Sequence, residues 1–334
     1  MKTISLFGVF VISFSFLFTV SNAFGQVSSS GETEQDLEVG KVSFVISAEA
    51  KAGFIYGQGE ELVYYGTTDT VLSQLLWDMK PLWYVGGDLA LSLGHSRWPF
   101  NLKVFDFSVK GCLPLASGKM EDRDWLYRPY DNSPTLFSSH DNFTSSAIFL
   151  DVDFLDFSFP FSFSSVTLSG DFFFRYSYMD LTWTARDGYM DYTKTGGSKY
   201  DHEGLAIDYT QTWNLFALGV GTGISVKDIF FADVSFAITP LIFVTAEDHH
   251  HITHMQYQDK PEGGLYLEPK ITLGLSTNKH FRFSVYFSYR HISGSKGESS
   301  SRVAGSGDYI KISGSTGGAA YRAMDSGIAI KVIF

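Results

Sequence analysis

Two short segments of the chain carry the side chains best suited to acid–base chemistry. In the first segment, Asp122 and Asp124 are separated by one residue, so in an extended strand both carboxylates point to the same side. Two carboxylates that close repel each other, so one tends to keep a proton, and the pair can position a water molecule. The alternative is a solvated acidic loop, because this spacing is common.

The second segment is Glu247-Asp248-His249-His250-His251. Asp248 and His250 share one face of a strand, and an aspartate that accepts an imidazole N–H fixes the ring and raises its basicity. The other ring nitrogen can then take a proton from water. Two alternatives remain, a metal ion shared by His249 and His251 and a solvated histidine-rich loop. Three adjacent histidines cannot all converge in a strand, which argues against a three-histidine zinc site.

The elements that must position these groups follow a period of two residues. Along residues 281–290, aromatic and aliphatic side chains alternate with serine, tyrosine and arginine. This pattern indicates a strand with one face toward lipid and the other toward a lumen. Residues 328–334 repeat the alternation and end on Phe334, which resembles the C-terminal signature of bacterial outer-membrane barrels. The alternative, a soluble sandwich, fits less well with so many apolar strand faces.

Other segments alternate with less regular phase. Residues 150–154 alternate, the phase slips at 155–157, and Pro160 follows, so we expect a turn there. Further strands are expected at residues 167–184, 206–220, 230–243 and 265–275. The long polar stretches at 118–142, 187–203, 246–264 and 293–318 are expected to be outward loops and, in part, strands that extend above the membrane.

The overall composition restricts the class of protein. The 334 residues are 44% hydrophobic and 16% aromatic, yet only the first segment contains a long apolar run. The net charge of −11 argues against a nucleic-acid partner, which would need a basic face, and is compatible with an acidic cleft for cationic ligands. Cys112 is the only cysteine, so an internal disulfide is impossible, and we expect it to be a small apolar strand residue.

The chain divides into three segments. Residues 1–23 are expected to be an export signal, with Lys2, an apolar run at 4–20 and small residues before a cut after Ala23. The alternative is a retained membrane helix, whose length would be marginal. Residues 24–40 form a polar N-terminal tail, and residues 41–334 form one barrel domain.

Taken together, these segments resemble the omptin family of outer-membrane proteases. Residues 118–125, with the aspartate pair before Trp125, resemble one family motif, and His140 follows at the family's distance. Asp248-His249-His250 resembles the family's Asp-x-His motif, and residues 71–77, 175–177, 185–189 and 207–211 resemble other family segments. The resemblance implies an all-β fold, a ten-stranded antiparallel transmembrane barrel that extends above the bacterial outer membrane, with an active-site groove facing outside the cell.

The resemblance also implies an aspartyl-type endopeptidase without an acyl-enzyme. Asp248 would orient His250 as general base, and the nucleophile would be a water between His250 and Asp122, with Asp124 supporting Asp122. The substrate-binding residues would be Glu61, which matches the family acid at the base of the pocket for the residue before the cut, and His140. The expected substrates are peptides or proteins cut next to basic residues.

The sequence departs from the family pattern at two acidic positions. Ala246 stands where the family has an acid two residues before its Asp-x-His aspartate, and Leu136 replaces an acid four residues before His140. Strict specificity for two basic residues is therefore in doubt, and a preference for a single basic residue is the alternative.

The remaining expectations concern partners. The resemblance implies a monomer that has no metal or organic cofactor and needs lipopolysaccharide as an activator, bound through outward basic residues, of which Arg175 and Arg186 are the nearest by position. A second hypothesis is a non-catalytic surface barrel that binds or adheres to cationic peptides or host proteins. A third, a barrel enzyme acting on lipid, would need a serine or threonine beside His250.

Overall fold

The computed structural model describes residues 42–66, 68–125, 133–313 and 315–334. The expected export signal (1–23) and the polar N-terminal tail (24–40) lie outside the described residues. Within the described ranges the chain consists of strands, turns and one short 3-10 helix, η1 (Thr193–Thr195). No helix in these ranges is long and apolar enough to cross a membrane.

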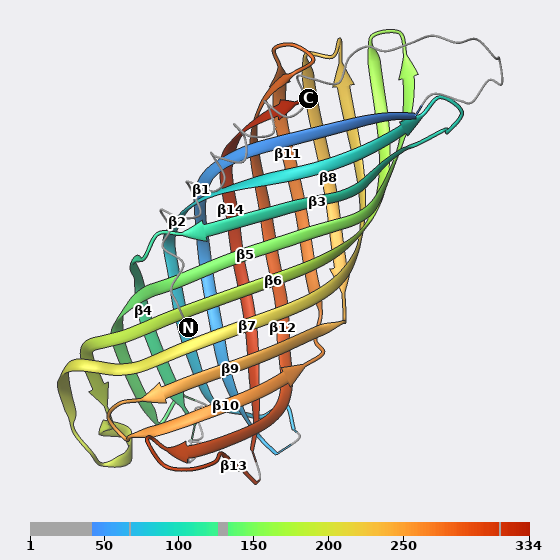
Figure 1. Ribbon diagram of the computed structural model, residues 1–334. Helices are drawn as coiled ribbons and strands as arrows, with labels where there is room; N and C mark the ends of the chain where they lie inside the picture. Colours follow the sequence, from blue (N-terminus) through green and yellow to red (C-terminus); the bar gives the residue numbers. More distant parts are fainter. Residues whose placement is uncertain (1–41, 67, 126–132, 314) are drawn as a thin grey trace.

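The strands, shown in Figure 1, follow one another along the chain in antiparallel pairs. Their bounds are β1 (Val42–Tyr65), β2 (Val71–His95), β3 (Asn101–Cys112), β4 (Leu115–Asp124), β5 (Leu136–Phe163), β6 (Val166–Asp191), β7 (Lys199–Val226), β8 (Phe230–Thr239), β9 (Ile242–His250), β10 (Met255–Glu262), β11 (Tyr266–Ser276), β12 (Phe281–Val303), β13 (Ile310–Lys311) and β14 (Ser315–Ile333).

The sheet closes on itself, as the alternation predicted. β1 pairs with both β2 and β14, and the first and last long strands run in register from Ser47 opposite Ile333 to Tyr65 opposite Ser315. Three positions in the ring are each filled by two strands placed end to end: β3 with β4, β8 with β9, and β11 with β10. The described part of the chain is therefore a ring of about ten strands, which confirms the predicted fold class.

Proline and glycine cause these breaks. Pro114 lies between β3 and β4, and Pro240 lies between β8 and β9. A proline has no N–H for the ladder, so it separates the strands on either side of it. Gly263 and Gly264, both with positive φ, separate β10 from β11. Residues 230–243, expected as one strand, are therefore two.

The expected turn is not at Pro160 but later, at Ser164 and Ser165. β5 continues to Phe163, and the phase slip is a bulge, with Leu155 at a φ of 50° and a register shift between Phe154 and Phe157. A bulge adds a residue to one strand without ending it. β3 pairs with β5 only as far as Ser158, so Pro160 removes no hydrogen bond on that open side.

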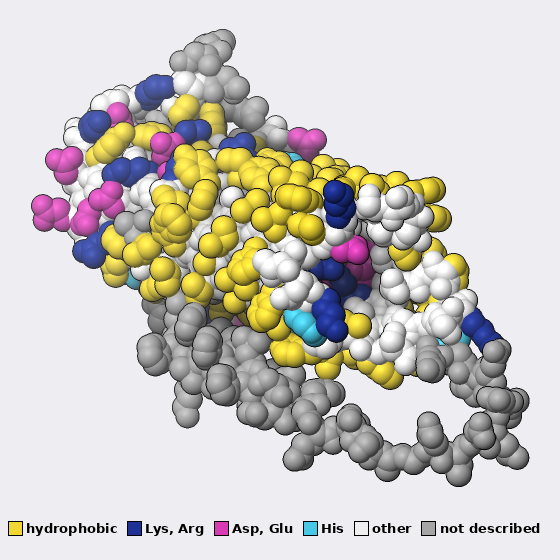
Figure 2. Space-filling view, turned by 90° about the horizontal axis from the view of Figure 1, so that it is seen from above, with side chains coloured by type: hydrophobic (Ala, Val, Ile, Leu, Met, Phe, Trp, Pro, Cys, Tyr) yellow, Lys and Arg dark blue, Asp and Glu magenta, His cyan; other side chains and the backbone are white. Residues whose placement is uncertain are grey.

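An apolar band surrounds the barrel. The outward side chains of β12, expected to face lipid, are 37–53% exposed although they are large and hydrophobic: Phe281, Phe283, Val285, Phe287 and Tyr289. Figure 2 shows hydrophobic side chains over the middle of the molecule, many charged side chains at one end, and others around a hollow toward the opposite end. A tilted strand crosses the bilayer in roughly 9–11 residues, whereas β5 and β7 have 28 each. The strands therefore extend well beyond the membrane, as predicted for the long polar stretches.

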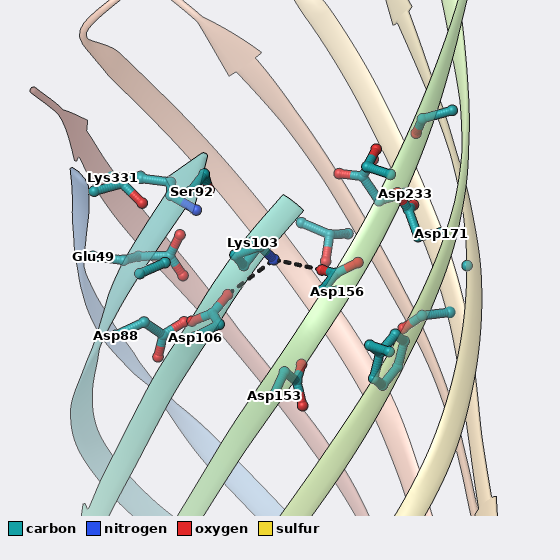
Figure 3. Close-up of a pocket in the computed structure, with 18 of the residues that line it drawn as sticks. Glu49, Asp88, Ser92, Lys103, Asp106, Asp153, Asp156, Asp171, Asp233 and Lys331 are labelled. Atoms are coloured by element: carbon teal, nitrogen blue, oxygen red, sulfur yellow. Dashed lines mark hydrogen bonds and ion pairs between the residues drawn. The ribbon is translucent and has the colours of Figure 1, made fainter. Parts of the chain in front are cut away.

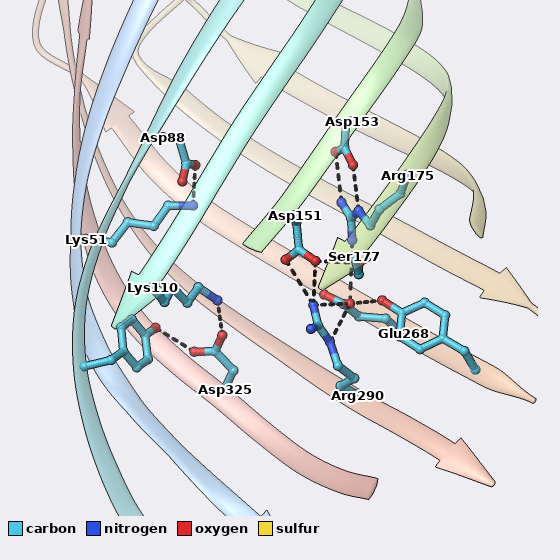
Figure 4. A network of polar contacts seen from close by, with 12 residues as sticks. Lys51, Asp88, Lys110, Asp151, Asp153, Arg175, Ser177, Glu268, Arg290 and Asp325 are labelled. Carbon is cyan, nitrogen blue, oxygen red and sulfur yellow. Dashed lines mark hydrogen bonds and ion pairs between the residues drawn. The ribbon is translucent and has the colours of Figure 1, made fainter. Parts of the chain in front are cut away.

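The interior within this band is charged and paired. Arg290 lies between Asp151 and Glu268, with N–O distances of 3.0 and 2.9 Å, and Arg175 binds Asp153 at 2.6 Å (Figure 4). Arg175 is buried in the lumen, so it is not one of the outward basic residues that were expected to contact lipopolysaccharide. The network joins several strands across the lumen and leaves no wide channel at this level.

A cavity of about 660 Å³ lies at the end of the barrel where the short turns are. Figure 3 shows acidic and basic side chains pointing into it from the surrounding strands. Lys103 bridges Asp106 and Asp156, at 3.1 and 2.9 Å. The predicted acid and histidine motifs are not among the residues that line this cavity.

An aromatic layer closes the other side of the ion network. Trp77, Trp183 and Tyr209 are 0–1% exposed, and their ring centroids lie 5.2–6.0 Å apart in near-parallel stacks. Tyr209 stands directly opposite Asp248 in the β7–β9 register. The predicted site therefore lies just beyond this aromatic floor, at the end marked by β4, β9 and β10 in Figure 1.

Candidate active site

The aspartate pair lies on the inner face of β4. Asp122 is opposite Leu75 of β2 and Ser138 of β5, and the Ser73 hydroxyl donates to Asp122 Oδ1 at 3.5 Å. Arg123, between the two acids, points to the opposite face, where it pairs with Glu121. Asp122 and Asp124 thus share one face, as the one-residue spacing requires.

The aspartate–histidine pair lies on the inner face of β9. Asp248 Oδ2 is 3.0 Å from Nε2 of His250, and Asp248 Oδ1 accepts the backbone N–H of Tyr257 at 3.0 Å. The Tyr257 ring packs against the imidazole, with centroids 5.3 Å apart. Both carboxylate oxygens are therefore engaged. A ring that donates Nε2–H to Asp248 keeps its lone pair on Nδ1, which can accept a proton.

The two pairs face each other across the barrel. Around the ring, β4 and β9 are separated on one side by β5, β6 and β7, and on the other by β2, β1, β14, β12 and β10. Asp122 and Asp124 are nevertheless both among the charges that raise the pKa of His250, and His250 is among those that lower the pKa of each aspartate. Because these charges act on one another, the acid pair of β4 and the Asp–His pair of β9 belong to one site.

Burial and charge set the protonation of the site. Burial and, after it, the Asp124 carboxylate raise the pKa of Asp122 to about 7, although His250 and Ser73 act to lower it. Burial also raises the pKa of Asp124. Burial lowers the pKa of His250, but the hydrogen bond to Asp248 and the surrounding carboxylates outweigh burial, so this pKa is raised. A buried acid with a pKa of about 7, across from a base whose pKa is raised, is suited to proton transfer.

Glu61 lies on β1 at the edge of this cluster and is 5% exposed. Burial raises its pKa well above the ordinary value, and the carboxylates of Asp248, Asp259 and Asp122 raise it further. Its Oε2 atom is buried and has no hydrogen-bond partner within the described ranges. Glu61 is therefore a buried acid in contact with the Asp–His wall, with an oxygen available to a ligand.

The two departures from the family pattern occupy defined places. Ala246 is 2% exposed and points inward on β9, and Asp259 of β10 stands directly opposite it in the register. Asp259 is itself 5% exposed and part of the acid cluster. Leu136 begins β5 opposite Asp124, where it contributes an apolar surface.

The structure does not bring His140 to the acid cluster. Its ring is 1% exposed, its Nδ1 lies 2.6 Å from the Asp187 carbonyl oxygen, and its nearest ring neighbour is His202. Burial lowers the pKa of His140, and the groups that modify this shift are Asp187, His202, Lys119 and Asp141. None of these four residues belongs to the acid cluster. Its role in substrate binding stays a prediction.

The other histidines of the segment point away from the site. The rings of His249 and His251 lie 4.1 Å apart, and His251 Nε2 is 2.8 Å from Asp208 Oδ2. Within the described ranges no group of three or more His, Cys, Asp or Glu is placed to hold a metal ion.

Sequence reasoning missed Asp259 and Ser73. Asp259 lies in a polar stretch with no motif, and only the hairpin register reveals it: with His250 opposite Met255, Ala246 falls opposite Asp259. The length of the turn between β9 and β10, which sets this register, is therefore the feature of the sequence that could have identified Asp259. Ser73 was noted as part of a family-like strand, but its neighbour in the sheet depends on how β4 pairs with β2.

The whole arrangement combines a closed outer-membrane-type barrel with an acid–base site at one end. A profile of the Omptin family matches residues 43–334. The chain belongs to the omptin family, whose members are outer-membrane proteases.

Two known proteins are similar to this chain over most of its length. The plasminogen activator of Yersinia pestis is 20% identical over 279 residues, which are 80% of this chain and 82% of that protein. The crystal structure of the outer membrane protease OmpT from Escherichia coli superposes with a TM-score of 0.72 at 18% identity, covering 91% of this chain and all of that chain. This structural similarity shows that the two proteins share the same fold.

Proposed function

We propose that the protein is an aspartyl-type endopeptidase of the bacterial outer membrane that activates a water molecule between His250 and Asp122. Nδ1 of His250 takes a proton from the water as the water oxygen attacks the peptide carbonyl carbon, and Asp248 holds the ring through Nε2. The tetrahedral intermediate then breaks its C–N bond, and the leaving amine takes the proton from His250. Asp122 hydrogen-bonds the same water, and Asp124 supports Asp122, whose pKa it raises. The observation that carries this proposal is the hydrogen bond of 3.0 Å between Asp248 and His250 on β9, across the barrel from the acid pair of β4.

The proposed substrates are peptides or proteins with a basic residue next to the cut. Glu61 supports this part of the proposal, because it is a buried acid with an unpaired oxygen beside the Asp–His wall. Carboxylates in such a setting recognise guanidinium and ammonium groups through charge-assisted hydrogen bonds. Leu136, beside Asp124, favours an apolar rather than a second basic residue on that side of the site.

We further propose that the site faces outside the cell and that the protein acts as a monomer. The connections at the opposite end are short, as in the turn between β5 and β6 and that between β7 and β8. Outer-membrane barrels keep their short turns on the periplasmic side. Lipopolysaccharide is the proposed activator. Arg186 is half-exposed near the site end, whereas Arg175 is buried and excluded from such a contact.

The first test is cleavage of fluorogenic peptides carrying Arg-Arg, Arg-Val or Ala-Ala by protein refolded in detergent, with and without lipopolysaccharide. Asp122→Asn and His250→Asn should each lower kcat/KM for the Arg-Val peptide by about 100-fold or more, because each removes a group that binds the attacking water. Lipopolysaccharide should raise the activity of the wild type.

Matched controls are available on the same strands. Glu121→Gln and His249→Asn change the neighbouring side chains, which point to the outer face, and should leave kcat/KM within about twofold. If folded wild-type protein cleaves none of the peptides under either condition, the protease proposal fails. The non-catalytic binding barrel then replaces it.

A further inference from the structure

Two buried carboxylates share a space beside the proposed water-activating groups. Glu61 Oε2 and Asp259 Oδ1 are both buried, and neither has a hydrogen-bond partner within the described ranges. A buried carboxylate oxygen without a partner is destabilising unless a ligand or water satisfies it. Two of them in one place point to a ligand that carries positive charge and several donors.

The register of three strands brings these acids together. Glu61 stands opposite Ala319 on β14, and Gly317, two residues earlier on β14, lies beneath Asp259. A Cβ atom built on Gly317 would be 2.2 Å from Asp259 Cγ. The small residues of β14 therefore leave the room that Asp259 needs to point toward Glu61.

The surroundings are acidic and aromatic. The carboxylates of Asp248 and Asp259 both raise the pKa of Glu61, and no cation is among the groups that shift the pKa of Glu61 or Asp259. Burial raises the pKa of Asp259 to about 7. Tyr209 is 1% exposed, and burial raises its pKa. The nearby charge of Glu61 raises the pKa of Tyr209 further. Aromatic walls with acids at the end suit a long aliphatic stem that ends in a cation.

Asp259 of β10 also lies across the hairpin from the position on β9 at which this chain lacks the family's acid. Ala246 is directly opposite Asp259, points inward and is 2% exposed. Directly opposed residues in an antiparallel pair have Cβ atoms roughly 4.5–5.5 Å apart. A carboxylate on β10 can therefore reach the space that a side chain at Ala246 would otherwise occupy.

We propose that Asp259 is the second acid of the substrate pocket and, together with Glu61, receives the arginine or lysine side chain of the residue before the cut. This inference rests on the proposed endopeptidase function and adds a specificity-determining residue to it. The acid is supplied by β10 rather than β9, and Gly317 gives it room. A basic side chain would pair with both unpaired oxygens, and its charge would favour the ionised forms of both acids.

The test compares peptides that differ only in charge. Two fluorogenic substrates carry arginine or citrulline before the cut, since citrulline is the neutral analogue of arginine with nearly the same shape. The wild type should prefer arginine by at least about tenfold. Asp259→Asn should remove most of this preference by lowering kcat/KM for the arginine peptide and leaving that for the citrulline peptide nearly unchanged.

A relocation variant and a control make the test specific. In the double variant Ala246→Asp/Asp259→Ala the acid moves to the opposite strand, and the preference for arginine should return at least in part. Glu262→Gln removes an exposed acid on the outer face of β10 and should leave the preference unchanged. Heat-modifiable migration in gel electrophoresis would verify that each variant is folded.

Failure of this inference differs from failure of the proposed function. An unchanged arginine preference in Asp259→Asn would overturn the role of Asp259 while the protease stands. If the wild type cleaves neither peptide, equilibrium binding of a fluorescein-labelled arginine peptide decides. Binding weakened at least about tenfold in Asp259→Asn, but not in Glu262→Gln, would support the cationic pocket, and unchanged binding would overturn it.

Discussion

At the scale of single residues, the properties of the site arise from carboxylates that are held close together in a buried place. Asp122 cannot ionise independently, because burial and the Asp124 charge raise its pKa to about 7. The pKa of His250 is raised as well, because the carboxylates around it stabilise its protonated form. Both shifts favour the protonated forms, so the site keeps its protons to higher pH than the isolated side chains would.

This coupling predicts the pH dependence of activity. His250 must be neutral to accept a proton, so kcat/KM should rise with pH through the neutral range and then level off. Asp124→Asn removes a charge that raises the pKa of both Asp122 and His250, so both values fall and the acid limb of the profile should move to lower pH. The measurement is kcat/KM against pH for a peptide without titrating groups in this range.

Glu121→Gln is the control for this prediction, because it removes a carboxylate from the same strand on the opposite face. Should Asp124→Asn turn over too slowly for a profile, the ring-carbon NMR titration of His250 gives the same comparison. An acid limb or a His250 titration that stays in place would contradict the coupling between the two walls.

The residues that sequence could identify are those whose geometry is local. Asp122 with Asp124, and Asp248 with His250, are separated by one residue, so any regular strand places each pair on one face. Asp259 was not identifiable in this way. Its place depends on which residue of β9 it faces, and a shift of the hairpin by one residue would turn it outward.

At the scale of elements, the site depends on strands that are much longer than a membrane crossing requires. Alternation predicted the strands and their lipid-facing side, because that side repeats large apolar residues. The bulge at Leu155 and the break at Pro240 were not predicted correctly, because each preserves a strand-like composition on both sides. Neighbouring strands, not the local sequence, decide whether a phase slip is a turn or a bulge.

β14 shows how a strand without polar groups can determine specificity. Gly317→Ala places a methyl group where the Asp259 carboxyl group lies, and the backbone there cannot move easily between β1 and β12. The displaced carboxylate can no longer meet a substrate cation. The preference for arginine over citrulline should therefore fall by about tenfold or more, although no charge has been removed.

The matched control for this substitution is Gly307→Ala, at a position where an added Cβ meets no atom within 4 Å. Both variants are assayed with the paired arginine and citrulline peptides. If Gly317→Ala and the wild type prefer the arginine peptide over the citrulline peptide equally, Asp259 does not need this space. The prediction that β14 affects specificity would then be wrong.

At the scale of the whole molecule, the barrel stacks layers with different tasks along its axis. The turn end holds a charged cavity, the membrane level holds the ion network, and the layer of Trp77, Trp183 and Tyr209 separates these from the site. The unpaired acids of the site lie on the far side of the aromatic floor. This order predicts that the ion network supports stability and that the site end supports activity.

Arg290 tests this division, since it contacts both Asp151 and Glu268 and is 8% exposed. Arg290→Met removes the cation that Asp151 and Glu268 share, and leaves Glu268 with only the longer ion pair to Arg175, at 3.6 Å. Breaking a buried ion pair in this way costs about 3–5 kcal/mol. The thermal unfolding midpoint in detergent should therefore fall clearly. The value of kcat/KM for the arginine peptide, measured well below that midpoint, should stay within about twofold of the wild type, because the aromatic floor lies between Arg290 and the site.

The triple variant Arg290→Met/Asp151→Leu/Glu268→Leu, which also removes the uncompensated acids, should recover much of the lost stability. A loss of activity in step with the loss of stability, in protein that is still folded, would show instead that the lumen network and the site act as one unit.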